Sequence, residues 1–188
     1  LSPIIERWNL LNHPFYQAWS AGTLPESALR AYAAEYGNFI ALLADGWDKA
    51  GNASHAAEER EHADLWATFT RALGSEITTP CTDGVKNLLS VAASEFADKD
   101  GVWGALYAFE VQQPATAASK LKGLQDFYAL PNDAHRYFEV HANDLYEADM
   151  IEAVLDEGQH PQARVAAACE RVCEAMWNAL SGFHHEAC

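Results

Sequence analysis

The sequence predicts an all-α protein folded as a single compact bundle of about seven helices. Glycine and proline lie in discrete clusters along the chain, and the segments between them are rich in Ala, Leu and Glu. Within these segments apolar residues recur three and four positions apart, which is typical of amphipathic helices, and strand-like alternation is absent. A chain of 188 residues buries roughly two-thirds of its unfolded surface, so residues 1–188 are expected to form one domain.

The first three helices are expected at about residues 2–21, 26–49 and 55–73. Gly22, Gly51 and Gly74 follow these ranges, and glycine commonly ends a helix because it adopts the left-handed conformation without strain. Pro25 stands at the start of the second helix, where its fixed backbone angle is already helical. Ser54 is expected to cap the third helix.

Four more helices are expected at about residues 84–97, 101–121, 132–155 and 161–183. The turn-rich stretch 75–83 separates them from the first three, and Pro131 and Pro161 stand at the starts of the last two. The linkers between the seven ranges have the lengths that join neighbouring helices of one bundle. No internal repeat indicates a second domain.

The charge of the chain excludes several classes of partner. The net charge is -15 at pH 7 with only 12 Lys and Arg residues, so the sequence offers no basic patch for nucleic acid or for an anionic membrane surface. No apolar run approaches the ~20 residues of a membrane span, and the first residues lack the layout of a signal peptide. The four cysteines are spread unevenly, unlike a secreted disulfide framework, so a cytoplasmic location is expected.

The third helix carries a spacing typical of metal sites in helical bundles. Glu59 and His62 are three residues apart and therefore lie on one face. His62 shares its side of the helix with Leu65, Trp66 and Phe69, which predicts that it faces the core. In a Glu-rich helix the same spacing also fits a surface salt bridge, so this pair alone leaves both interpretations open.

Two further helices place ionisable residues on apolar faces. Glu110 follows Tyr107 in an apolar and aromatic segment without a nearby basic residue, so its carboxylate is expected to be paired, protonated or bound to a metal. His141 and Asp144 again lie three residues apart, although His141 alone also fits a hydrogen-bonded core histidine. Together these places favour a metal site, and imidazoles with carboxylates suit non-haem iron or manganese better than structural zinc.

A series of landmarks runs along nearly the whole chain, at residues 11–19, Gly22, Leu24, Tyr32, Glu35, Tyr36, 62–66, 72–74, 107–110, Pro114, Gly123, Leu124, Tyr137, Phe138, His141, Trp177 and Gly182. In order and spacing, these residues resemble the haem-oxygenase-like superfamily, which includes the TenA thiaminases, the quinone-cofactor synthase PqqC and the haem-oxygenase-like di-iron oxidases. The landmarks are more specific for the fold than for the activity.

The resemblance to the di-iron branch implies a set of metal ligands. In that branch a Glu and a His come from the third core helix, a carboxylate from the central helix, and two His and an acid from the sixth. Carried over residue by residue, this pattern matches four residues of this chain, Glu59, His62, Glu110 and His141.

The sixth helix departs from the family spacing. The positions of the remaining acid and histidine fall on Leu145 and Ala148, which cannot bind a metal. Asp144 and Glu147 each stand one residue earlier, and they are the expected substitutes. Some relatives place the first Glu seven residues before the His, at the position that His55 occupies here.

The resemblance implies a non-haem iron oxidase or oxygenase that activates O₂ with one or two iron ions, manganese being an alternative. The expected substrate is a small molecule such as an amino-acid or fatty-acid derivative, and Glu110 and Tyr107 are the expected catalytic residues. Members of the superfamily often pair, so a homodimer is expected.

Three other functions compete with this one. A TenA-type thiaminase is disfavoured, because it needs a cysteine nucleophile in the central helix and the chain has none between Cys81 and Cys169. A cofactor-independent oxidase like PqqC needs a polar pocket, for which the central and sixth helices offer few basic residues. A non-catalytic helical binding protein, with Glu110 protonated and the histidines merely hydrogen-bonded, stays open.

Overall fold

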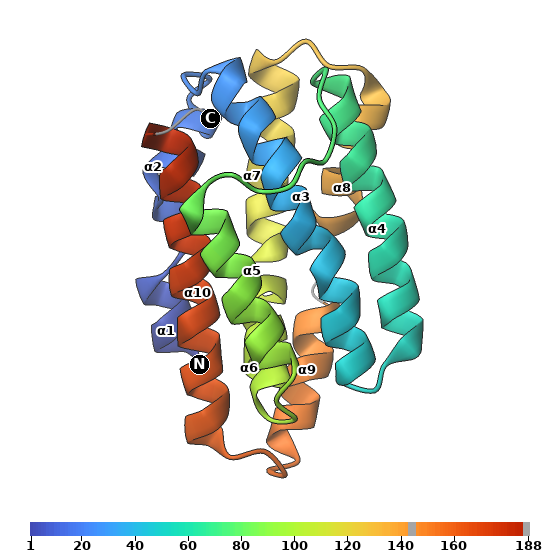
Figure 1. Ribbon diagram of the computed structural model, residues 1–188, viewed down its shortest axis with the longest axis vertical. Helices are drawn as coiled ribbons and strands as arrows, with labels where there is room; N and C mark the ends of the chain where they lie inside the picture. The colour runs from blue at the N-terminus through green and yellow to red at the C-terminus, as the bar shows by residue number, and fades with distance from the viewer. Residues whose placement is uncertain (143–145, 186–188) are drawn as a thin grey trace.

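The structure is a computed structural model that describes residues 1–142 and 146–185, and these residues contain helices and no strand (Figure 1). The elements are α1 (Ser2–Arg7), η1 (Leu10–Asn12), α2 (Pro14–Ser20), α3 (Glu26–Lys49), α4 (Ala53–Ala72), α5 (Asp83–Phe96), α6 (Gly101–Glu110), α7 (Gln113–Phe127), η2 (Asn132–His135), α8 (Arg136–His141), α9 (Tyr146–Asp156) and α10 (Gln162–His185). The all-α prediction is confirmed. Within the described ranges, no helix combines the length and the apolar character needed to cross a membrane.

Each of the seven expected helical segments is present, and three of them are divided. The first consists of α1, η1 and α2, because the side chains of Asn9 and His13 cap new helical segments and Pro14 stands in the first turn of α2. The fifth is divided between α6 and α7, where Pro114 stands in the first turn of α7. The sixth consists of η2, α8 and α9.

The predicted helix ends are correct at the glycines and wrong at one cap. Gly22, Gly51 and Gly74 have positive φ angles of 67°, 82° and 72°, as a left-handed helix end requires. The cap of α4 is Asn52 and not Ser54, because the Asn52 side chain accepts a hydrogen bond from the backbone nitrogen of His55 at 3.1 Å. The hydroxyl of Ser54 instead donates to Asn52 Oδ1 at 2.9 Å.

The long helices pack in two groups that enclose an aromatic core. Helix α3 lies against α4, and α10 lies against α5 and α6 (Figure 1). The short helix α8 contacts both α4 and α7. Trp19, Tyr32, Trp66, Phe69 and Phe138 are fully buried where α2, α3, α4 and α8 meet. This packing holds α8 against the inner face of α4, where the histidines of both helices lie.

Candidate metal centre

The inner face of α4 carries three potential metal ligands. His55, Glu59 and His62 follow one another at spacings of four and three residues, so they share one face of the helix. His55 and Glu59 are buried, at 4% and 2% exposure, whereas the side chain of His62 is 20% exposed. The predicted inward orientation of this face is therefore confirmed, and a simple surface salt bridge between Glu59 and His62 does not describe it.

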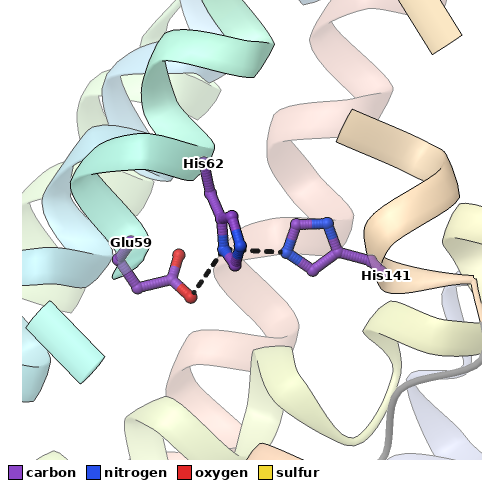
Figure 2. A group of neighbouring side chains, drawn as sticks. All are labelled: Glu59, His62 and His141. Atoms are coloured by element: carbon purple, nitrogen blue, oxygen red, sulfur yellow. Dashed lines mark hydrogen bonds and ion pairs between the residues drawn. The ribbon is translucent and has the colours of Figure 1, made fainter. Parts of the chain in front are cut away.

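Helix α8 adds His141 to this face, completing a group of three side chains (Figure 2). The Nδ1 atom of His62 lies 3.2 Å from Glu59 Oε1 and 3.2 Å from His141 Nε2. One potential ligand atom from each of Glu59, His62 and His141 lies within 4.8 Å of the others. Two ligand atoms on opposite sides of one ion are separated by about 4.2 Å. The three side chains therefore need only small movements to bind a common ion.

A backbone hydrogen bond orients His141 toward the group. Its Nδ1 atom lies 2.6 Å from the carbonyl oxygen of Tyr137, which can only accept, so Nδ1 carries the hydrogen. Burial, followed by the charge of His62, lowers the pKa of His141 to about 4. The imidazole is therefore neutral at pH 7 and its Nε2 lone pair faces Glu59 and His62. This is the arrangement that second-sphere hydrogen bonds impose on metal-binding histidines.

A buried oxygen atom of Glu59 indicates that the group can bind a divalent metal ion. Glu59 Oε2 is buried and has no hydrogen-bond partner among the described residues. A buried carboxylate oxygen without a partner is costly, and a bound cation removes that cost. Burial lowers the pKa of His62, but the hydrogen bond and negative charge of Glu59 outweigh it and the net shift is upward, so the Glu59 carboxylate favours a positive charge at its own position. Two imidazoles and a carboxylate suit iron or manganese.

Glu110, predicted as a ligand and a catalytic residue, is buried near this group without belonging to it. Its side chain is 4% exposed, and Oε1 accepts a hydrogen bond from Trp47 Nε1 at 3.2 Å. Burial raises the pKa of Tyr137 well above its ordinary value, and the negative charges of Glu59 and Glu110 raise it further. Both carboxylates thus act on one tyrosine, which locates Glu110 on the same side of the core.

The two sixth-helix substitutes have different outcomes. Asp144 lies outside the described residues. Glu147 is buried at 9% exposure in the first turn of α9, and its Oε1 atom lies 3.5 Å from Nε2 of His55. The structure therefore pairs Glu147 with the α4 face, at the residue that stands seven positions before His62.

Tyr107, the second predicted catalytic residue, faces a different part of the molecule. Its hydroxyl donates to Glu152 Oε1 at 2.7 Å. Both side chains line a cavity of about 620 Å³ between α6, α9 and the start of α10, which is also lined by His160. His160 itself is paired with Asp100, with 2.8 Å between Nδ1 and Oδ1.

Lys120, which the sequence pattern did not single out, lies in α7 beside the metal-binding group. Its ammonium nitrogen lies 5.4 Å, 5.8 Å and 5.4 Å from the ring centres of Tyr16, Trp66 and Phe138. The residue is 3% exposed, and within the described part of the chain it has no hydrogen bond or ion pair. Burial lowers its pKa to about 7. The sequence could have indicated Lys120 by its position among the buried residues of α7. Lysine is almost never fully buried without a partner, so a lysine at such a position is unusual.

The comparisons with known proteins find similar sequences along nearly the whole chain. A family model described as an iron-containing redox enzyme matches residues 41–181, and a model of the TENA/THI-4/PQQC family matches residues 3–45. A 4-aminobenzoate synthase of Nitrosomonas europaea is 30% identical, over 98% of this chain and 89% of that protein. A 4-aminobenzoate synthase of Chlamydia pneumoniae is 27% identical, over 95% of this chain and 91% of that protein.

Solved structures confirm the fold. A domain with a haem oxygenase-like fold from Shewanella denitrificans has a TM-score of 0.81 at 17% identity, covering 97% of this chain and 89% of that one. A TenA homologue from Pseudomonas syringae has a TM-score of 0.76 at 17% identity, covering 98% and 89%. Together with the matched family model, these similarities establish that the chain has the haem-oxygenase-like fold and belongs to the iron-containing redox enzyme family.

Proposed function

We propose that this protein is an O₂-dependent non-haem iron enzyme whose product is 4-aminobenzoate. The observation that carries the proposal is the buried group of Glu59, His62 and His141, in which one carboxylate oxygen has no partner among the described residues. The relatives from Nitrosomonas and Chlamydia, which are named as 4-aminobenzoate synthases and match nearly the full chain, support the choice of product.

The residues of the centre have distinct roles in this proposal. Glu59, His62 and His141 would hold the iron, which supplies the capacity to activate O₂ and to accept electrons from an organic molecule. The hydrogen bond from His141 to the Tyr137 carbonyl keeps Nε2 directed at the ion site. The buried aromatic side chains around the centre exclude water from the reacting groups.

Lys120 supplies the basic group of this environment. With a pKa of about 7, a large fraction of its side chain is the free amine at neutral pH, and Nζ can accept a proton there. Its three aromatic neighbours, Tyr16, Trp66 and Phe138, suit contact with a flat aromatic molecule. An unpaired buried lysine lowers stability, so its presence beside a metal-binding group supports a functional role.

Growth rescue of a bacterial strain that cannot make 4-aminobenzoate tests the proposal, and it does so without the substrate having to be identified first. We expect the wild-type chain to support growth in medium without 4-aminobenzoate, and His141→Ala and Glu59→Gln to fail because they remove iron ligands. The matched control is His160→Ala, which removes a histidine paired with a carboxylate elsewhere in the bundle and should support growth.

Each other outcome contradicts a stated part of the proposal. If the Nitrosomonas relative rescues growth and the soluble wild-type chain does not, 4-aminobenzoate is not the product. If His141→Ala and Glu59→Gln rescue as well as the wild type does, the reaction does not use this metal centre. A cofactor-independent oxidase like PqqC would behave in this second way.

A further inference from the structure

The cavity beside Tyr107 is separate from the candidate metal centre. It has a volume of about 620 Å³ and lies where the chain turns from α9 into α10, against α6 and the start of α1 (Figure 1). Sites for small molecules commonly have volumes of ~300–1,000 Å³. Glu59, His62 and His141 do not line this cavity. The cavity therefore has the size of a ligand site, and the iron proposal assigns no role to it.

One face of α9 gives the cavity its negative charge. Glu152 and Asp156 are four residues apart, so they share a face of the helix, and both line the cavity. His160 also lines it, and Asp100 offsets the charge of this histidine whenever it is protonated, with 2.8 Å between Nδ1 and Oδ1. Among the described lining residues there is no lysine or arginine. The cavity therefore attracts a cation.

Tyr107 holds one of the two carboxylates in place. Its side chain is 5% exposed, and its hydroxyl donates to Glu152 Oε1 at 2.7 Å. Burial raises the pKa of Tyr107 well above its ordinary value, and the hydrogen bond and charge of Glu152 raise it further. The tyrosine is therefore a permanent hydrogen-bond donor at neutral pH. Its hydrogen bond orients the Glu152 carboxylate, which reduces the entropy lost when a ligand binds.

The rest of the wall is apolar, which favours an organic ligand over a bare ion. Leu155 lies on the same face of α9 as Glu152, three residues away. Pro161 and the buried Val165 extend the apolar surface from the start of α10. A ligand that fills this cavity gains from burying an apolar group beside its charge. A hydrated metal ion would leave that surface unused.

We propose that this cavity binds a small organic amine, whose ammonium group contacts Glu152 and Asp156 and whose apolar part packs against Leu155 and Val165. The site lies apart from the iron centre, and the inference does not depend on the proposed function. It extends the protein's chemistry to a second, cationic ligand.

Binding of phenethylamine, compared with the neutral phenethyl alcohol of nearly the same shape, tests the site. Isothermal titration calorimetry at pH 7 uses an ionic strength of ~0.15 M, which screens general attraction to the net charge of -15. We expect the amine to bind at least about tenfold more tightly than the alcohol, because only the amine makes charge-assisted hydrogen bonds. Glu152→Gln and Asp156→Asn should each weaken amine binding about fivefold.

Two further variants locate the binding. Glu157→Gln removes the same charge next to Asp156 from a residue that does not line the cavity, and it should change amine affinity less than about twofold. Leu155→Trp places a larger side chain in the cavity and should abolish binding of both compounds. Circular dichroism checks that each variant is folded.

The contrary results are equally specific. Equal affinity for amine and alcohol, or no binding of the amine at millimolar concentration, would overturn the proposal. It would also fail if Glu157→Gln weakened binding as much as Glu152→Gln does, or if folded Leu155→Trp bound the amine as the wild type does. None of these variants changes Glu59, His62 or His141, so the growth-rescue test of the iron enzyme is decided separately.

Discussion

The pKa of Lys120 lies far below the ordinary value for a lysine. Its pKa falls from 10.5 to about 7, because burial among aromatic rings penalises the charged form and no anion of the described residues offsets the penalty. Between about pH 7 and 10.5 the unfolded chain therefore binds more protons at this lysine than the folded chain does. The stability of the fold is expected to rise with pH through this window and to carry the full penalty below pH 7.

Replacing this lysine by an apolar side chain of similar length should stabilise the protein. We expect Lys120→Met to raise the free energy of unfolding at pH 7 by an amount of the order of 3 kcal/mol, with a smaller gain at pH 9. Urea unfolding at the two pH values measures both effects. Lys122→Met on the same helix removes an exposed lysine and should change stability by less than about 0.5 kcal/mol. Equal effects of the two substitutions would contradict the assigned burial of Lys120.

The site residues that could be predicted from the sequence are those fixed by spacing within one helix. Glu59 and His62 lie three apart beside an apolar stripe, and helix geometry alone turns them inward. The pairing of His55 with Glu147 could not be predicted in the same way, because it depends on how α9 packs against α4. The same spacing argument predicts Asp144, whose role stays a prediction because it lies outside the described residues.

Among the elements, α6 and α10 pack closely at Gly104, which has no side chain. A Cβ atom at Gly104 would overlap the backbone carbonyl of Val165 in α10. Backbone atoms of a helix cannot yield locally, so Gly104→Ala should lower the free energy of unfolding by about 1–3 kcal/mol. Thermal or urea unfolding measures the change.

Gly182 of α10 is the matched control for Gly104. A Cβ atom at Gly182 would meet only Thr82, at the ordinary distance of 3.7 Å. Gly182→Ala should therefore stabilise the helix by about 0.5–1 kcal/mol, as alanine does in a helix interior. If both substitutions stabilise the protein, the close contact between α6 and α10 is not present in solution.

The order of the seven helical segments was predictable from the sequence. The breaks inside three of these segments were only partly predictable. All seven expected segments are helical because amphipathic periodicity and glycine stops are local properties of the sequence. The breaks inside three of them arise from side-chain caps such as Asn9 and His13, which compete with continuation of the helix. The sequence contains these residues, but a cap and a mid-helix polar residue look alike until the neighbouring helices are placed.

At the scale of the whole molecule, the candidate centre joins helices that are far apart in the sequence. Glu59 and His62 come from α4 and His141 from α8 (Figure 2). Helix α8 contacts α4, and buried aromatic side chains of both helices pack together there. An ion bound at this place therefore links separate parts of the bundle. The proposed enzyme activity requires that this ion binds.

Metal analysis of anaerobically prepared protein tests that claim most directly. Chelator-treated wild type is incubated with Fe²⁺, desalted without O₂ and assayed for iron, alongside a His62→Ala and His141→Ala double variant whose helix content is checked by circular dichroism. We predict at least one iron per wild-type chain and at least one fewer in the folded double variant. A folded wild-type chain that retains no iron, or a double variant that retains as much as the wild type, would contradict the assignment of Glu59, His62 and His141 as the metal centre.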